Sequence, residues 1–246
     1  MLRLAPRLLR RVGSPSMCGR FLQRFAWDDL CAFLRIEGPP ANLRPRYNLA
    51  PSQRAAVVRG EDGERRLSLL RWGLIPAWAR DPAIGHKLIN ARAETAAAKP
   101  AFRAAFSKRR CLVPADGFYE WRREGPVRQP WLVARRDGAP MAFAGLWEHW
   151  TVPEGAALRG SLAERRPGEV VETFTILTTE ANATLRALHH RMPVILPEEA
   201  FGPWLSGTEV RLGPAPEDRL AMRRVALRVN NPRNDDPECA AALASA

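Results

Sequence analysis

Residues 110–121, RCLVPADGFYEW, decide the fold class expected for this chain. They form two short apolar runs, at 110–114 and 117–121, with Ala115 and Asp116 between them. Runs of this length, rich in Val, Phe, Tyr and Trp, are typical of strands rather than helices. We therefore expect a hairpin-like pair of strands here.

Similar short runs continue on both sides of this stretch. We expect further strands at 21–25, 55–58, 65–74, 131–134, 141–147, 174–179 and 224–229. Short helices are expected at 27–34, from 95 to about 108, and at 181–188, and an exposed insertion loop at 152–170. The 22 prolines also favour short elements. The sequence therefore predicts one α+β domain of mainly antiparallel strands, with sheets curling toward a barrel and short flanking helices.

The charge of the chain indicates the chemistry of its partner. The 246 residues carry a formal net charge of +12, and nearly all of the cations are arginines. Guanidinium binds phosphate in a planar, two-pronged geometry, so the excess favours a phosphate-rich partner such as nucleic acid. A GC-rich coding bias is the alternative explanation for Arg over Lys, but it does not explain the excess over acids.

The cysteines, Cys18, Cys31, Cys111 and Cys239, are widely spaced and form no CxxC pair. They read as reduced thiols rather than as a disulfide framework or a zinc site. No apolar run approaches the roughly 18–20 residues of a membrane span. We expect no metal, no cofactor and no membrane contact.

Residues 1–16 contain four arginines and no acid. Their apolar part is too short for a good secretory signal, and an organelle transit peptide and an upstream start codon remain as alternatives. We favour the last, and expect residues 1–16 to be a non-native or removed extension before a single domain at 17–246.

The stretch Met17-Cys18-Gly19-Arg20-Phe21 supports that choice through its chemistry. If the chain begins at Cys18, that residue carries a free thiol and a free α-amine. The amine condenses with an aldehyde to an imine, and the thiol then closes a thiazolidine ring. An α-amine has a pKa of about 7.7–8.0, so a useful fraction is nucleophilic near neutral pH.

Other residues have both a catalytic and an ordinary interpretation. His189 could be a surface histidine, and Glu120 an outward-pointing carboxylate on a strand edge. Asn90 could cap the following helix. Arg92 and Arg191 could be solvated surface charges.

Taken together, the motifs around these residues are far more specific. CGRF, YNLAP, RWGLIPAW, NARAET, RCLVPADGFYEW, FAGLWE, TILTTEAN and HHRMPVIL occur in this order between Cys18 and Leu196. In these motifs the chain resembles the SRAP family, the SOS-response-associated peptidase-like proteins that sense abasic sites in DNA. The resemblance extends from Cys18 to about Asn231.

The resemblance implies a role for each candidate residue. Cys18 would be the nucleophile that forms a thiazolidine with the ring-opened aldehyde of an abasic site in single-stranded DNA. His189 would assist sugar-ring opening, Glu120 would carry protons for the imine step, and Asn90 would hold the amine or a sugar oxygen. The expected DNA contacts are Arg20, Asn48, Arg92 and Arg191. Trp78 and Trp121 are added because single-strand binders commonly stack aromatic rings on bases, with packing in the core as the alternative for each.

The resemblance also implies a partner and a location. We expect a monomer that binds abasic single-stranded DNA in the cytoplasm, in association with the nucleoid. As written, Met17 acylates Cys18, so the chemistry requires a start at Met17 or removal of residues 1–17, which the same Cys, Glu and His could catalyse. Two alternatives stay open: an N-terminal-nucleophile cysteine peptidase or amidohydrolase using Cys18, His189 and Asn90, and a non-catalytic single-strand-binding module.

Overall fold

The computed structural model describes residues 19–38 and 41–243. Cys18 and the extension at 1–16 lie outside the described residues. The helices are α1 Trp27–Leu34, α2 Ala93–Ala96, α3 Arg103–Lys108, α4 Ala183–Arg186 and α5 Phe201–Leu205. The strands are β1 Phe21–Gln23, β2 Arg46–Leu49, β3 Arg54–Glu61, β4 Glu64–Trp72, β5 Asn90–Arg92, β6 Arg110–Ala115, β7 Gly117–Glu124, β8 Val127–Arg135, β9 Met141–Thr151, β10 Val170–Glu180, β11 Arg191–Pro193, β12 Ile195–Leu196 and β13 Leu220–Arg224.

Five of these strands close into a barrel. β10, β4, β3, β6 and β9 pair in succession, and β9 pairs back with β10. The β4–β10 pair is parallel and the other pairs of the ring are antiparallel. β5 and β11 pair with the C-terminal part of β10, and β12 pairs with the start of β9. The predicted curling of a sheet toward a barrel is thus confirmed.

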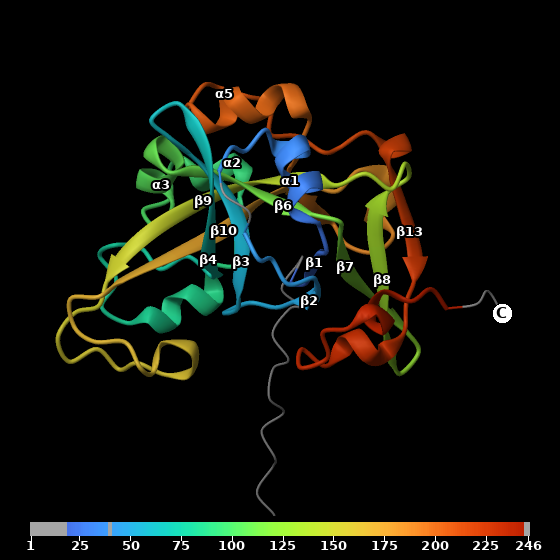
Figure 1. Ribbon diagram of the computed structural model, residues 1–246. Coiled ribbons are helices and arrows are strands. Elements are labelled where there is room, and N and C mark those ends of the chain that lie inside the picture. The colour runs from blue at the N-terminus through green and yellow to red at the C-terminus, as the bar shows by residue number, and fades with distance from the viewer. Residues whose placement is uncertain (1–18, 39–40, 244–246) are drawn as a thin grey trace, which may run out of the picture.

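A second, antiparallel sheet has the order β13-β8-β7-β1-β2. Figure 1 shows β7, β8 and β13 side by side, with the barrel strands β3, β4, β9 and β10 on the other side of the molecule. Gln23 on β1 links the two sheets. Its side chain bonds the backbone N–H and C=O of Ala56 on β3 and the C=O of Pro114 on β6.

The predicted hairpin at residues 110–121 is wrong. β6 pairs with β3 and β9 in the barrel, whereas β7 pairs with β1 and β8 in the second sheet. Asp116 is the crossing point, and its carboxylate accepts from the backbone N–H of Arg24 at 2.6 Å. At Gly117 a Cβ would lie 2.7 Å from the Val133 carbonyl oxygen, so this passage between sheets requires glycine.

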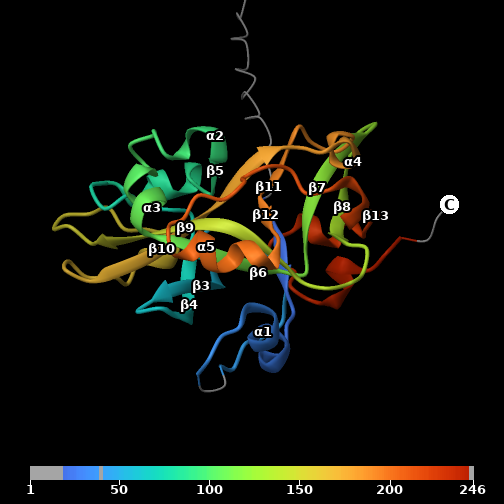
Figure 2. The same cartoon turned by 90° about the horizontal axis from the view of Figure 1, so that it is seen from above.

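The helices α1, α2, α3 and α5 pack against the barrel strands in a second hydrophobic cluster, and Figure 2 shows α5 lying over β6 and β9. α1 has the predicted bounds, but the helix expected at 95–108 is divided into α2 and α3 around Pro100. Proline lacks the N–H and clashes with the preceding turn, which explains the break. The strand expected at 224–229 ends at Arg224 and is followed by a 3₁₀ turn at Leu227–Asn230, and the expected loop at 152–170 contains only a 3₁₀ turn, Gly160–Leu162, before β10.

The main hydrophobic cluster lies between the barrel and the second sheet. Phe21 of β1 and Phe118 of β7 pack there edge-on against Phe143 of β9, and Phe21 also packs against Trp72 of β4. Both sheets therefore share one core, and the predicted class, a mainly antiparallel α+β domain with few short helices, is confirmed.

Candidate functional site

An open pocket of about 370 Å³ begins at the first described residue after Cys18. Its wall consists of Gly19, Arg20, Pro51, Trp121, Arg128 and Asn230. The lining contains two arginines, one tryptophan and no carboxylate. This composition suits an anion beside an aromatic or sugar group, which is the chemistry of a nucleotide.

Arg20 is held firmly at this pocket. Its Nη1 donates to Asn48 Oδ1 and to the Val229 carbonyl, each at 2.8 Å. Its guanidinium carbon lies 5.9 Å from the centre of the Trp121 ring. Burial, together with the positive charge of Arg128, lowers the pKa of Arg20 from its usual value. An anion in the pocket would relieve this repulsion.

Glu120 lies on β7, a central strand of its sheet, with β1 on one side and β8 on the other. Its side chain is 4 % exposed. The alternative of an outward-pointing carboxylate on a strand edge is therefore wrong. The next residue, Trp121, donates from its indole N–H to Asn230 Oδ1 at 2.6 Å, and Arg128 covers the ring at 5.2 Å.

Asn90 and Arg92 lie on β5, which runs parallel to β10, with Asn90 opposite Ile176 and Arg92 opposite Thr178. The residue at the N-cap of α2 is Arg92, so the alternative that Asn90 caps that helix is wrong. Arg92 is exposed, and its side chain forms no hydrogen bond or ion pair within 19–38 and 41–243. It is available to a ligand.

His189 is half-buried at the start of the turn into β11. Its Nδ1 accepts the backbone N–H of Arg191 at 3.0 Å, and its ring stacks on His190 with centroids 4.3 Å apart. Burial lowers the pKa of His189 from its usual value, and the neighbouring His190 adds to the effect. A neutral ring whose Nδ1 accepts carries its proton on Nε2, so His189 presents an N–H donor at neutral pH.

Arg191 is buried and engaged by protein groups. Its two terminal nitrogens bind both carboxylate oxygens of Glu94 at 2.6 and 2.7 Å, and Nη2 also donates to the Thr178 carbonyl at 2.5 Å. This ion pair lowers the pKa of Glu94. The geometry fixes β11 to β10 and α2, and leaves Arg191 less accessible to a phosphate than Arg92.

The four predicted catalytic segments meet at one core. Phe21, Ile89, Phe118 and Leu188 all belong to the main hydrophobic cluster, and they lie next to or near Cys18, Asn90, Glu120 and His189, respectively. Trp72 connects two of them directly, since its ring packs on Phe21 and its indole N–H donates to the Ile89 carbonyl at 2.9 Å. Segments far apart in sequence are thus brought to one region.

Asn48 and Trp78 are placed differently from the other predicted DNA contacts. The Asn48 side chain is completely buried, and its amide donates to the carbonyls of Val229, Asn231 and Asn234. In this conformation it positions Arg20 and offers no surface to DNA. Trp78 is 62 % exposed on a turn outside the pocket beside Gly19.

Two pocket residues, Arg128 and Asn230, were missed in the sequence analysis. Arg128 is opposite Arg123 in the β7–β8 pair, hence diagonal to Trp121. Gly125 in the turn between β7 and β8 is a hairpin signal in the sequence. A hairpin centred on this turn pairs the two strands so that Arg128 lies near Trp121. Asn230 follows a 3₁₀ turn and carries no sequence signal of its own.

Within residues 19–38 and 41–243, no three His, Cys, Asp or Glu side chains gather in a way that could hold a metal ion. The same residues contain no helix long and apolar enough to cross a membrane. Cys31, Cys111 and Cys239 are free thiols, and burial raises the pKa of each.

The chain is similar to known proteins over most of its length. The family model described as SOS response associated peptidase (SRAP) matches residues 17–232. The chain is 39% identical over 232 residues to the abasic site processing protein YoqW of Bacillus subtilis, covering 90% of this chain and 98% of that protein. It is 33% identical to the abasic site processing protein YedK of Escherichia coli, with 90% and 98% covered. A crystal structure of a protein from Bacteroides thetaiotaomicron superposes with a TM-score of 0.78 at 25% identity, covering 92% of this chain and all of that one.

Proposed function

The chain belongs to the SOS response associated peptidase (SRAP) family, and from this we propose that it processes abasic sites in single-stranded DNA by covalent capture. The α-amine and thiol of Cys18 react with the ring-opened sugar aldehyde and form a thiazolidine, which shields the lesion. YoqW and YedK are named abasic site processing proteins, which supports the substrate class.

The observation that carries this proposal is the pocket next to Cys18. Gly19 lines it together with Arg20, Arg128 and Trp121. Gly19 is bonded to Cys18 in the sequence, and it shares this pocket with two guanidinium groups and an indole ring. That is where a nucleophile would meet an aldehyde flanked by phosphates and bases.

The proposed reaction balances without an oxidant, a reductant or a metal. The Cys18 amine attacks the C1′ aldehyde carbon, and the carbonyl oxygen leaves as water with the two amine protons. The thiol then adds across the resulting C=N bond: Sγ bonds to C1′, and the thiol proton moves to nitrogen. Both steps need proton transfers, and the departing oxygen needs a donor.

His189 and Glu120 supply these proton transfers in the proposal. An abasic deoxyribose is mostly a closed hemiacetal, and the Nε2–H of neutral His189 can donate to the ring oxygen as the ring opens. Glu120 accepts protons from the attacking amine and returns one to the departing hydroxyl. Asn90 holds the amine or a sugar oxygen by hydrogen bonds that add no charge.

Arginines hold the phosphates on either side of the missing base. Arg20 and Arg128 lie in the pocket that Gly19 lines, and Arg92 is exposed on β5. Arg191 is assigned chiefly to positioning, because Glu94 already occupies its two-pronged face. Trp121 offers its ring to a neighbouring base.

An amide nitrogen cannot form an imine, so the active form is expected to begin at Cys18. Removal of Met17 by an aminopeptidase and self-cleavage by Cys18, Glu120 and His189 both give that terminus. In the second route the Cys18 thiol attacks the carbonyl carbon of residue 17, and the C–N bond between residues 17 and 18 breaks, which leaves a thioester and a free α-amine on Cys18. Water then hydrolyses the thioester, so that the preceding peptide leaves as a carboxylate and the thiol is regenerated.

The test is the intact mass of the purified protein incubated with a single-stranded oligonucleotide containing one abasic site. The expected product survives denaturant and weighs the sum of both partners less one water. Cys18→Ala should abolish this product but retain an imine that borohydride traps. A wild type that binds the DNA without covalent product would support the binding-module alternative, and acylation of Cys18 by a peptide substrate would support the peptidase alternative.

A further inference from the structure

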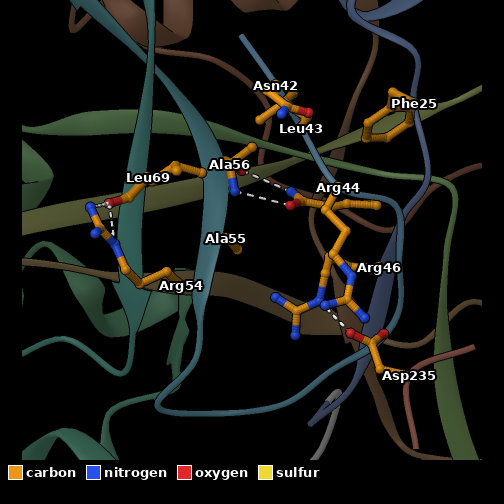
Figure 3. A pocket seen from close by; sticks show the side chains of 11 residues that line it. Phe25, Asn42, Leu43, Arg44, Arg46, Arg54, Ala55, Ala56, Leu69 and Asp235 are labelled. Carbon is orange, nitrogen blue, oxygen red and sulfur yellow. Dashed lines mark hydrogen bonds and ion pairs between the residues drawn. The ribbon is translucent and has the colours of Figure 1, made fainter. Parts of the chain in front are cut away.

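A second, larger pocket of about 460 Å³ shares no lining residue with the pocket beside Gly19. Residues of β1, β2, β3, β4 and the segment before β2 line it: Gln23, Phe25, Asn42, Leu43, Arg44, Arg46, Arg54, Ala55, Ala56, Leu69 and Asp235. Figure 3 shows Arg54 and Leu69 on one side of the opening and Arg44, Arg46 and Asp235 on the other. We call it the Arg44–Arg54 pocket.

The charge in the Arg44–Arg54 pocket is not balanced. Arg46 is bound to Asp235, the one carboxylate among the lining residues. Arg54 donates from Nε and Nη2 to the Leu69 carbonyl, a neutral partner. Arg44 is exposed, and its side chain forms no hydrogen bond or ion pair with the part of the chain that the structure describes. Two positive charges therefore face the opening without a counterion.

The lining of the same pocket also includes apolar side chains. Leu69 is 45 % exposed although it lies on a barrel strand, and Phe25 and Leu43 are only partly buried. Guanidinium groups beside an accessible aromatic ring are the combination that holds a nucleotide in single-strand binders, with phosphate on the cations and a base on the ring. A small inorganic anion would use only the cations.

Hydrogen bonds through β2 connect the Arg44–Arg54 pocket to the pocket beside Gly19. Asp235 binds Arg46 and the backbone N–H groups of Tyr47 and Asn48. Asn48 in turn holds Arg20. Arg46 and Asn48 are two residues apart on β2, a distance of about 7 Å at 3.3 Å per residue. One strand of DNA could therefore lie in both pockets.

We propose that the Arg44–Arg54 pocket binds a phosphodiester and its base from the DNA strand that carries the lesion, at a position away from the abasic sugar. This inference rests on the proposed function. The pocket extends the interface along the strand, so it adds affinity that depends on the length of DNA flanking the lesion. It makes no contact with the reacting aldehyde.

The experiment compares noncovalent binding of labelled single-stranded oligonucleotides of two lengths, with about 2 or about 10 nucleotides on each side of a central tetrahydrofuran. That abasic analogue has no aldehyde, so binding is separated from crosslinking. Each exposed arginine–phosphate contact is worth about 1 kcal/mol or less, so Arg44→Gln/Arg54→Gln should weaken binding of the long oligonucleotide by up to about 25-fold. The slope of the logarithm of the binding constant against the logarithm of the salt concentration should become less negative by about 1.4, that is about 0.7 for each lost phosphate contact.

A charge-matched control, Arg136→Gln/Arg166→Gln, removes two exposed arginines outside both pockets. This control variant should gain as much affinity as the wild type when the DNA flanking the lesion is lengthened. Thermal melting of each variant establishes that it is folded. If Arg54→Gln destabilises the protein, the binding measurement is made with Arg44→Gln alone, because that substitution removes no hydrogen bond of the described chain.

The inference is overturned if the double variant shows the same long-to-short affinity ratio as the wild type, or if the control loses as much. It is also overturned if inorganic phosphate or a mononucleotide shows the Arg44- and Arg54-dependent binding while DNA length has no effect. Failure of the proposed function has a different signature: the wild type forms no covalent product with aldehyde-containing DNA, whatever the length dependence.

Discussion

Replacement of His189 by alanine tests the proposed proton transfer most closely. In the folded protein Nδ1 of His189 accepts the Arg191 backbone N–H, which leaves Nε2 as the only ring atom able to exchange a proton with substrate. His190 stacks on the same ring and is exposed. His190→Ala is therefore the matched control, with a similar loss of imidazole and none of the proposed chemistry.

The size of the effect follows from the protonation state. A histidine with the ordinary pKa of about 6.5 is roughly three-quarters neutral at pH 7. Burial lowers the pKa of His189 below that value, so the neutral, Nε2–H form is a still larger fraction. General acid–base catalysis contributes about 10²–10⁴-fold, so His189→Ala should slow adduct formation by at least about 10²-fold at pH 7. His190→Ala should remain within a few-fold of wild type.

The lowered pKa of His189 also determines the direction in which the stability of the folded protein changes with pH. Below about pH 6.5 the unfolded chain takes up a proton at this position more readily than the folded protein does. Because protons bind the unfolded state preferentially, wild-type stability should fall as the pH drops through this range. His189→Ala should lack that part of the pH dependence.

The assay is single-turnover crosslinking followed by denaturing gel or mass spectrometry across pH 5.5–8, with an NMR titration of the His189 ring. Wild-type rates in His189→Ala would refute the catalytic role. A ring pKa above 6.5, or a His190→Ala variant as slow as His189→Ala, would refute the argument from burial and tautomer.

Three further predictions test other parts of the site and fold. Glu120→Gln should slow crosslinking by about 10²-fold or more, while anisotropy shows unchanged affinity for tetrahydrofuran-containing DNA, because the buried side chain carries protons and no phosphate; equal rates would contradict this. Arg92→Ala should make the log–log slope of DNA binding against salt concentration less negative by about 0.7. Arg191→Ala should instead chiefly lower the free energy of unfolding in urea, by about 1–2 kcal/mol, because Glu94 loses its partner. The reverse pattern would exchange the roles of the two arginines. Gly117→Ala should destabilise the protein by about 1–3 kcal/mol in the same urea assay, since the new Cβ meets the Val133 carbonyl oxygen at 2.7 Å; an unchanged midpoint would mean that the two sheets separate easily there.

The sequence predicted local structure better than it predicted the connection between sheets. α1 was predicted with its observed bounds because an apolar stripe ending in buried Leu34 marks one face. The residues around Asp116 have the composition of a hairpin, but the partners of β6 and β7 are strands distant in sequence. Tertiary pairing decided the topology there, and turn composition carries no information about it.

The sequence motifs predicted the candidate site residues, and the structure shows which hydrogen bonds position several of them. The role of Asn48 could not be inferred from its motif, because it depends on carbonyls of residues 229–234, almost two hundred positions away. The engagement of Arg191 by Glu94 likewise depends on β11 lying beside β10 and α2. Whether a polar side chain faces a ligand or a structural partner is set by these long-range contacts.

The central claim is that Cys18 reacts as the first residue of the chain, through both its amine and its thiol. Tryptic digestion of the purified DNA adduct, followed by peptide sequencing in the mass spectrometer, tests this directly. The account predicts that the sugar remnant is attached to a peptide comprising Cys18-Gly19-Arg20, with no residue before Cys18 and no free thiol. A remnant on a lysine, or on a peptide that retains Met17, would contradict it.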